Sequence, residues 1–404
     1  MTALAGLKVV DMTHIMAGPT CTLMLADMGA DVIKVEKLAG GDDTRRSIPP
    51  AIGDQSAAFL MMNRSKRGIA LDLRTEGGKQ VLRRLLKDAD VLVENYRRQT
   101  LPKLGFDYES LRAENPGLIY CAISGFGRTG PYKDRGGFDL VTQAMSGIMS
   151  ITGTRKGEPP VKCGAPLTDI TAGLLATIGI LAALRSREQT GKGQMVDTSL
   201  LEAGAIQTYW QSAITLATGE APGPMGSAHP LNAPYQAFEA SDGWIVVGGA
   251  NETNWRRLVE LLGVPELAAD PRFETNAQRM AHLGELEAAL NEQFRKRSAE
   301  DWLAALEAAG VPAGPVYDIA EMHRDPQILA RDMVVEVEHS TLGPVKTLGL
   351  PIKFSDTPGG PRWGAPLLGQ DTRAVLLEHG YAEAEIDALA QAGAIGEAGG
   401  ATQE

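Results

Sequence analysis

Residues 7–36 read LKVVDMTHIMAGPTCTLMLADMGADVIKVE, and this stretch decides the fold class. It begins with a short apolar strand, Leu7–Met12, which leads into a loop, Thr13–Pro19. Thr20–Met28 then has the composition of a buried helix, and Asp31–Glu36 is a second apolar strand. The stretch therefore predicts a β-α-β unit, in which a crossover helix joins two parallel strands.

The same alternation of strands and helices continues to about residue 200. Further strands are expected at Gly68–Leu73, Val91–Val93, Leu118–Ile123 and Val196–Ser199, and helices at Glu76–Leu86 and Tyr108–Glu114. This pattern predicts an α/β fold whose doubly wound, Rossmann-like sheet has helices on both faces. Ligands of such sheets bind beyond the carboxyl ends of the strands, where the loop at 13–19 lies. That loop lacks G-x-G-x-x-G, so we predict no dinucleotide site.

Length, composition and charge limit the number of domains and the kinds of binding partner that this protein can have. A chain of 404 residues is too long for one ordinary core, and its net charge of −11 argues against nucleic acid or an anionic membrane as partner. Three widely spaced cysteines and the lack of a signal-like N-terminus favour a reducing cytoplasm. The six histidines are dispersed, so no metal site is expected. The longest apolar run, Ile170–Leu184, is shorter than the roughly 20 residues that cross a bilayer, which indicates a core helix.

A second, smaller α+β domain is expected in the later part of the chain. Residues 220–232 are rich in Pro and Gly, and Tyr235–Ala240 and Trp244–Gly249 flank a Ser-Asp-Gly turn that predicts a hairpin. The expected boundaries are a large domain at 1–203, a linker at 204–222, a small domain at 223–325 and a return to the large domain at 326–404.

One acidic residue, Asp169, stands where a loop containing Pro160, Gly164 and Pro166 becomes the long apolar helix. A carboxylate in the first turn of a helix accepts hydrogen bonds from free N–H groups and interacts well with the helix dipole. Helix capping is therefore the simplest interpretation of these residues, and a catalytic carboxylate is the alternative.

Several segments in order resemble the class III coenzyme A transferases, the family of formyl-CoA and carnitine CoA-transferases. They are residues 4–45, 91–111, 124–140, the segment around Asp169 and residues 190–203, with later matches at 226–238 and 242–251. The resemblance implies a large domain built from both chain ends, a small domain between them, and a homodimer of two interlocked subunits. It also implies that CoA and acyl-CoA are substrates and that no cofactor or metal is permanently bound.

The resemblance gives Asp169 the role of nucleophile, attacking the acyl-CoA thioester to form an anhydride and then an aspartyl-CoA thioester. The family's CoA contacts match His14, Met16, Ala17, Lys37, Leu71, Arg74, Asn95, Tyr96, Arg97 and Lys103. Its substrate loop and neighbouring positions match Gly226, Ser227, His229 and Phe138.

At three positions this sequence differs from formyl-CoA transferase or from the racemases, and these differences indicate which reactions to expect. Met16 replaces a Gln of formyl-CoA transferase, which disfavours a formyl-CoA and oxalate pair, and Lys103 replaces an Arg. The α-methylacyl-CoA racemases, which share the fold, need a His where this chain has Phe138, and phenylalanine cannot move a proton. A racemase-like epimerase and a non-catalytic acyl-CoA-binding protein are the alternatives.

The later segments look most like the branch that uses succinyl-CoA and small dicarboxylates of the glutarate, itaconate, mesaconate, malate or citramalate type. The resemblance therefore implies succinyl-CoA as donor and a small dicarboxylic acid as acceptor, with a cation or His229 pairing the distal carboxylate.

Overall fold

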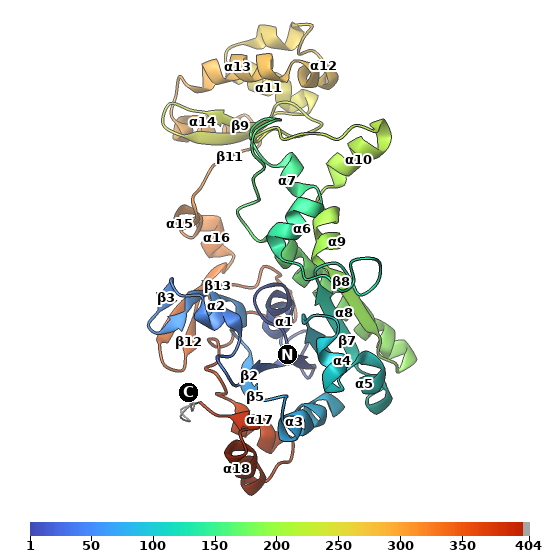
Figure 1. Ribbon diagram of the computed structural model, residues 1–404. Helices are drawn as coiled ribbons and strands as arrows, with labels where there is room; N and C mark the ends of the chain where they lie inside the picture. Colours follow the sequence, from blue (N-terminus) through green and yellow to red (C-terminus); the bar gives the residue numbers. More distant parts are fainter. Residues whose placement is uncertain (399–404) are drawn as a thin grey trace. The chain divides into compact units, whose positions relative to one another are not determined.

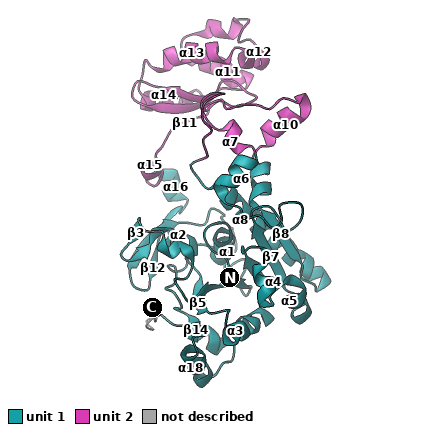
Figure 2. Ribbon diagram, viewed as in Figure 1, with its two compact units in different colours: residues 1–146, 164–207, 325–404 teal, residues 147–163, 208–324 magenta. Residues whose placement is uncertain are grey.

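The computed structural model describes residues 1–398, which form two compact units (Figure 2). The first unit contains residues 1–146, 164–207 and the chain from 325 onward, and the second contains 147–163 and 208–324. The chain thus leaves the first unit twice and returns to it twice.

A seven-stranded sheet forms the centre of the first unit (Figure 1). Its strands are β1 (Lys8–Asp11), β2 (Asp31–Lys37), β5 (Arg67–Leu71), β6 (Val91–Glu94), β7 (Ile119–Ser124), β8 (Met195–Ser199) and β14 (Ile395–Gly396). The order across the sheet is β14-β5-β2-β1-β6-β7-β8, and every neighbouring pair is parallel except β14 with β5. Counted along the chain, the six parallel strands have the order 3-2-1-4-5-6, which is that of doubly wound nucleotide-binding folds. The predicted α/β class is confirmed.

Successive residues of the central strands enter two different cores, because side chains of a strand point alternately to opposite faces. Val9 belongs to the core that also contains Cys21, Ala172 and Ile180, whereas Val10 belongs to the core on the other face. Helices α1 (Ala17–Asp27) and α8 (Leu167–Thr190) cover the first face. The second is covered by α3 (Glu76–Lys87), α5 (Tyr108–Glu114), α17 (Thr372–Glu378) and α18 (Glu383–Gln391).

Helix α1 begins earlier than the sequence predicts, at Ala17 instead of Thr20. Pro19 is thereby in the first turn, where its missing N–H removes no hydrogen bond from the helix. Helix α8 crosses α1 at very short range: a Cβ on Gly173 would lie 2.5 Å from the carbonyl oxygen of Ala17. This crossing places the first turns of α1 and α8 beside each other at the carboxyl edge of the sheet.

By length and composition alone, α8 is apolar enough to cross a membrane, with a mean hydropathy of 1.8 over its 18-residue window. It is also longer than the apolar run that predicts it. Its buried residues, among them Ala172, Ala176 and Ile180, pack in the core of the first unit. A buried helix of a globular core passes the same test, so this finding is weak evidence for a membrane span.

The second unit has a small antiparallel sheet, β11-β10-β9, with its own apolar core. The predicted hairpin is present as β9 (Tyr235–Glu239) and β10 (Trp244–Gly248), and β11 is Ala313–Pro315. The helices of this unit are α7 (Ile148–Ile151), α10 (Tyr209–Thr218), α11 (Glu252–Leu261), α12 (Asn276–Ala281), α13 (Leu283–Phe294), α14 (Ala299–Ala308) and α15 (Ile319–Met322).

Smaller elements complete the first unit. They are η1 (Asp43–Arg46), β3 (Ala51–Ile52), β4 (Gln55–Ser56), α2 (Ala57–Asn63), α4 (Thr100–Leu104), α6 (Asp139–Met145), α9 (Leu200–Ile206), α16 (Pro326–Ala330), β12 (Val334–His339) and β13 (Gly343–Leu348).

The units differ from the boundaries drawn on the sequence in two places. Residues 147–163 group with the second unit, and most of the segment 204–222, expected as a linker, is helical in α9 and α10. The Gly/Ala-rich segment near the chain end carries no strand pattern in the sequence, yet Ile395 and Gly396 pair with Leu71 and Ala70 at the edge of the sheet.

Candidate active site

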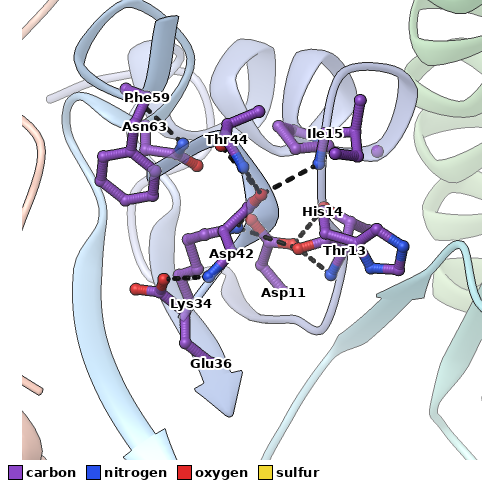
Figure 3. A network of polar contacts seen from close by, with 12 residues as sticks. Asp11, Thr13, His14, Ile15, Lys34, Glu36, Asp42, Thr44, Phe59 and Asn63 are labelled. Carbon is purple, nitrogen blue, oxygen red and sulfur yellow. Dashed lines mark hydrogen bonds and ion pairs between the residues drawn. The ribbon is translucent and has the colours of Figure 1, made fainter. Parts of the chain in front are cut away.

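A buried ionic network fixes the loop that follows β1 (Figure 3). Lys34, fully buried on β2, donates to the Thr13 carbonyl oxygen at 2.9 Å and to Asp42 at 2.9 Å. Burial disfavours the charged form of Asp42, but Lys34 and the Thr44 N–H outweigh it and lower the pKa of Asp42 to about 2. Asp42 in turn accepts from the Ile15 N–H at 3.2 Å. The ion pair thus supports the loop from beneath, where no water competes for it.

Asn95, which follows β6, fixes the next residue of the same loop. Its side-chain oxygen accepts from the His14 N–H at 3.0 Å, and its side-chain nitrogen donates to the His14 carbonyl at 2.8 Å. Because β1 and β6 are neighbours in the sheet, the loops at their carboxyl ends meet. Ile15, the next residue, has a φ of +69°, a conformation that β-branched residues rarely adopt.

A small cavity opens at this edge, lined in part by His14, Lys37 and Tyr96, three of the predicted CoA-binding residues. The rings of His14 and Tyr96 meet edge to face, with centroids 5.2 Å apart. Burial lowers the pKa of His14 and raises that of Tyr96, so both side chains are neutral at pH 7. Lys37 forms an ion pair with Asp43 at 2.8 Å. The cavity therefore offers neutral hydrogen-bonding groups beside one cation, Lys37, and its lining also includes the carboxylates of Glu36, Asp42 and Asp43.

The first turn of α8 is held by a second carboxylate, Asp139, which is the first residue of α6. Asp139 accepts from both the backbone N–H and the hydroxyl of Thr168, at 2.9 and 2.8 Å. The Gln143 amide donates to the other oxygen of Asp139 at 2.7 Å. Asp139, a residue of α6, thus caps α8, and the carboxylate of Asp169 does not serve as the cap.

Asp169 lies half-buried in the first turn of α8, with an unusual electrostatic environment. Within residues 1–398 its carboxylate accepts no hydrogen bond and forms no ion pair. Burial, followed by the negative charge of Asp139, raises the pKa of Asp169 to about 6. Since Asp169 lies one turn before Gly173 on the same helix face, it faces the first turn of α1, which follows the His14 loop. The first unit therefore places a poorly solvated carboxylate in the first turn of α8, one turn from the crossing with α1.

The other predicted CoA contacts are less uniform. Ala17 is buried as the first residue of α1, and Met16, which precedes it, provides no side-chain cap for the helix. Arg97 and Lys103 are exposed, as is Arg74, whose side chain pairs with Asp72 at 2.7 Å. These three cations are accessible to solvent, but they are not among the residues that line the cavity.

Leu71 is the predicted CoA contact that the structure places differently. It is 1% exposed and packs in the core between β5 and the helices, so its side chain is not accessible to a ligand. Any contact from this position has to come from the backbone.

Phe138 is 75% exposed directly before α6. Its loop is fixed by two glycines that pack backbone to backbone: a Cβ on Gly125 would lie 2.6 Å from the Cα of Gly137. The start of α6, and with it Asp139, is held in place by this contact.

The remaining predicted residues belong to the second unit, where they form one cluster. Gly226 adopts a φ of +63°, and the Ser227 hydroxyl accepts from the Ala237 N–H at 3.0 Å. The His229 ring stacks on Tyr235 with centroids 5.3 Å apart and meets the edge of Trp210 at 5.9 Å. Its Nδ1 accepts from the Leu231 N–H at 3.1 Å, so the neutral ring carries its proton on Nε2.

Two residues of the site, Asp139 and Asp42, were not assigned a role from the sequence. Asp139 directly follows Phe138 at the start of α6, and this position signals at most a role in α6, whereas its carboxylate caps α8. Asp42 lies in a Gly-rich loop that resembles an exposed turn, and its burial depends on Lys34 from another element.

Among the described residues, no group of three or more His, Cys, Asp or Glu side chains is arranged to hold a metal ion.

Comparisons with known proteins agree with this geometry. The model of CoA-transferase family III matches residues 4–372. The succinate–glutarate CoA-transferase of Agrobacterium fabrum is 41% identical over 93% of this chain and 95% of its own, and the acetyl-CoA:oxalate CoA-transferase of Acetobacter aceti is 41% identical over 94% and 96%. A crystal structure of a CaiB/BaiF family protein from Brucella suis superposes with a TM-score of 0.83 at 43% identity, covering 94% of this chain and 99% of that one. This chain belongs to CoA-transferase family III.

Proposed function

We propose that this chain transfers CoA from succinyl-CoA to a small dicarboxylic acid, and that Asp169 carries the acyl and CoA groups covalently between them. The observation that carries the proposal is the unpaired, half-buried carboxylate of Asp169 in the first turn of α8, the helix that crosses the start of α1. With a pKa of about 6, Asp169 is mostly ionised at neutral pH, yet it is poorly solvated and therefore nucleophilic.

In the proposed reaction, the acceptor acid replaces succinate as the carboxylic acid that is joined to CoA, through intermediates on Asp169. Asp169 attacks the thioester carbonyl of the donor, giving an aspartyl-succinyl anhydride and free CoA thiolate. The thiolate attacks the Asp169 acyl carbon, which releases succinate and leaves an aspartyl-CoA thioester. The acceptor carboxylate attacks that thioester, which frees the thiolate again and forms a second anhydride, between Asp169 and the acceptor. The thiolate then attacks the acceptor acyl carbon, which forms the product thioester and regenerates Asp169.

His229 is proposed to recognise the distal carboxylate of the acceptor. Its Nδ1 is occupied by the Leu231 N–H, which leaves Nε2–H as a directed donor, and Tyr235 and Trp210 fix the plane of the ring. A hydrogen bond to an ionised carboxylate is shorter and stronger than one between two neutral groups. Gly226 and Ser227 of the same unit are proposed as further substrate contacts, and Phe138 of the first unit is proposed as another.

The relatives support a dicarboxylate acceptor but do not single one out. Their names state glutarate for Agrobacterium fabrum, oxalate for Acetobacter aceti, mesaconate for Haloarcula hispanica and D-citramalate for Chloroflexus aurantiacus. All four lie between 36% and 41% identity to this chain, so identity alone does not rank the acceptors.

We also propose that the enzyme is a homodimer. Helices α6 and α8 of the first unit leave large apolar side chains exposed, at 41 to 62% for Leu140, Val141, Met145, Leu174 and Ile178. A second copy of the chain would bury this surface, as exposed apolar patches of this kind usually mark interaction sites.

An acceptor screen tests the proposed function. The enzyme is incubated with succinyl-CoA and, in separate reactions, glutarate, mesaconate, itaconate, malate, citramalate, oxalate and carnitine, and the CoA esters are separated by mass. We expect a new thioester with at least one C4 or C5 dicarboxylate. Turnover of oxalate and carnitine alone would contradict the proposal. Exchange of an α-proton of a 2-methylacyl-CoA with deuterated water, without transfer, would establish the epimerase instead, and CoA binding without either reaction would indicate a binding protein.

A further inference from the structure

We propose that Asn95 and Asp42 are positioning residues that clamp the backbone of residues 13–15 in a strained conformation, so that the CoA site exists before CoA binds. This inference rests on the proposed function, since it takes CoA as the ligand of the cavity beside His14. It assigns Asn95 to the loop itself, whereas the family resemblance places it among the CoA contacts.

Four successive backbone groups of the loop are each bound by a side chain from another element. The Thr13 carbonyl accepts from Lys34 at 2.9 Å, and the Ile15 N–H donates to Asp42 at 3.2 Å. Between them, the His14 N–H and carbonyl are both bound by Asn95, at 3.0 and 2.8 Å. Loops usually leave such groups to water. Here the partners are Lys34 on β2, Asn95 directly after β6 and Asp42 directly before η1.

The clamp holds a conformation that the loop would not choose by itself. Ile15 has a φ of +69°, and a β-branched side chain is strongly disfavoured there. The Ile15 side chain is 42% exposed, so burial of that side chain does not account for the conformation. The polar contacts on either side of it do, and they include a Lys34–Asp42 ion pair whose two side chains are wholly buried.

The clamp has a consequence for the ligand. The conformation at residues 13–15 turns the His14 ring against Tyr96, and both rings line the cavity with Lys37. Because the loop is already ordered, it loses little conformational entropy when CoA binds, and the affinity for CoA is correspondingly higher.

The test measures CoA affinity, by calorimetry, and transfer kinetics in four proteins. Asn95→Ala removes both contacts to His14, and we expect its dissociation constant for CoA to rise about tenfold, equivalent to about 1.4 kcal/mol. Ile15→Asn alone should change the affinity less than threefold, because asparagine adopts positive φ with little strain. In the double variant, the increase in the logarithm of the dissociation constant should be at least a third smaller than in Asn95→Ala alone. The reason is that asparagine at position 15 adopts the loop conformation without the full clamp.

Asn115→Ala is the matched control. Asn115 is equally half-buried in the first unit and donates to the carbonyls of Leu86, Lys87 and Ala89, so its loss also frees backbone groups. It should lower the melting temperature without changing CoA affinity.

Hydrogen exchange on the unaltered enzyme gives a second readout that needs no variant to fold. The amides of His14 and Ile15 should exchange at least about 100-fold slower than free peptide, although they lie in a loop. Fast exchange of both amides, or equal affinity of Asn95→Ala and the parent, would overturn the proposal. Strictly additive effects of Asn95→Ala and Ile15→Asn would also overturn it, since they would mean that Asn95 contacts CoA directly. If the parent enzyme itself does not bind CoA, the proposed function fails, and slow exchange at His14 and Ile15 would still establish the clamp.

Discussion

Asp169 differs from an ordinary helix-capping aspartate in what surrounds its carboxylate. A capping carboxylate accepts hydrogen bonds from the helix N-terminus, which keeps its pKa low. At α8 that work is done by Asp139 from another helix, through the N–H and hydroxyl of Thr168. Burial and the negative charge of Asp139 therefore both raise the pKa of Asp169, and no described residue lowers it. The same arrangement that stabilises the helix leaves a reactive group.

The pH dependence of transfer should report this environment. Asp169 must be ionised to attack, so kcat/KM should rise with pH through about 6 and fall below it. In Asp139→Asn one negative charge is lost while burial remains, so the pKa of Asp169 falls and the acid limb should move down by about one pH unit. Asp134→Asn, which removes an exposed carboxylate paired with Arg98, should leave the limb in place. If the acid limb of Asp139→Asn did not move, the charge of Asp139 would not be a cause of the raised pKa of Asp169.

His229 should affect the acceptor and not the donor. Loss of its Nε2–H in His229→Ala leaves one end of a dicarboxylate without a partner, so KM for the acceptor should rise about tenfold. Formation of the aspartyl-CoA intermediate from succinyl-CoA should be unchanged. His282→Ala removes an exposed histidine of the same unit that pairs with Glu285, and should have neither effect. If His229→Ala slowed only the donor half-reaction, its assignment would be wrong.

At the scale of elements, the crossing of α1 and α8 sets the position of Asp169 relative to the start of α1. The small side chains at the crossing allow the two backbones to approach, and Gly173 is the point of closest contact. Both helices also begin at the carboxyl edge of the sheet, because α1 follows β1 and α8 precedes β8.

Gly173→Ala should therefore separate the two helices. The added Cβ would lie 2.5 Å from the Ala17 carbonyl and 2.7 Å from the Thr20 Cβ, and backbone at that distance has to move. We expect a loss of about 1–3 kcal/mol in the free energy of unfolding and a larger fall in kcat/KM than the stability alone explains. Gly284→Ala in α13, where nothing lies within 4 Å, should be neutral or slightly stabilising. Unchanged activity and stability in Gly173→Ala would contradict the proposed geometry.

Much of the first unit follows from periodicity and turn residues. The strands and helices up to β8 lie within a few residues of their predicted ranges because each has a continuous apolar face. The pairing of β14 with β5 was missed, since two residues of a Gly/Ala-rich tail carry no strand pattern and are ordered only by the sheet edge. In the second unit, the sequence predicts one helix at 277–296, whereas the chain forms α12 and α13 with a break at His282.

The site was predictable in part for the same reason. His14, Lys37 and Tyr96 share a cavity because all three follow neighbouring strands, which is a consequence of topology. The burial of Asp42 and the capping of α8 by Asp139 depend on partners far away in sequence. No local pattern encodes such contacts, and the pKa of Asp169 depends on them.

At the scale of the whole molecule, the exposed apolar face of α6 and α8 is the surface that a homodimer would cover. Leu174 and Ile178 lie four residues apart on α8 and are 41% and 62% exposed. Ile178→Lys should place a charge in the interface and shift sedimentation velocity from a dimer toward a monomer. Leu377→Lys, at a similarly apolar exposed position on α17, should leave the dimer intact. A parent enzyme that sediments as a monomer at micromolar concentration would contradict the homodimer.

Covalent transfer through Asp169 is the central claim, and trapping of the intermediate tests it most directly. The enzyme is incubated with succinyl-CoA in the absence of acceptor, treated with hydroxylamine, digested and analysed by mass spectrometry, with Asp169→Asn as control. The account predicts a hydroxamate on the peptide containing Asp169 in the parent and none in Asp169→Asn, which should also lose transfer activity by at least about 1,000-fold. An unmodified Asp169 in an enzyme that still transfers CoA, or a hydroxamate on a different residue, would contradict it.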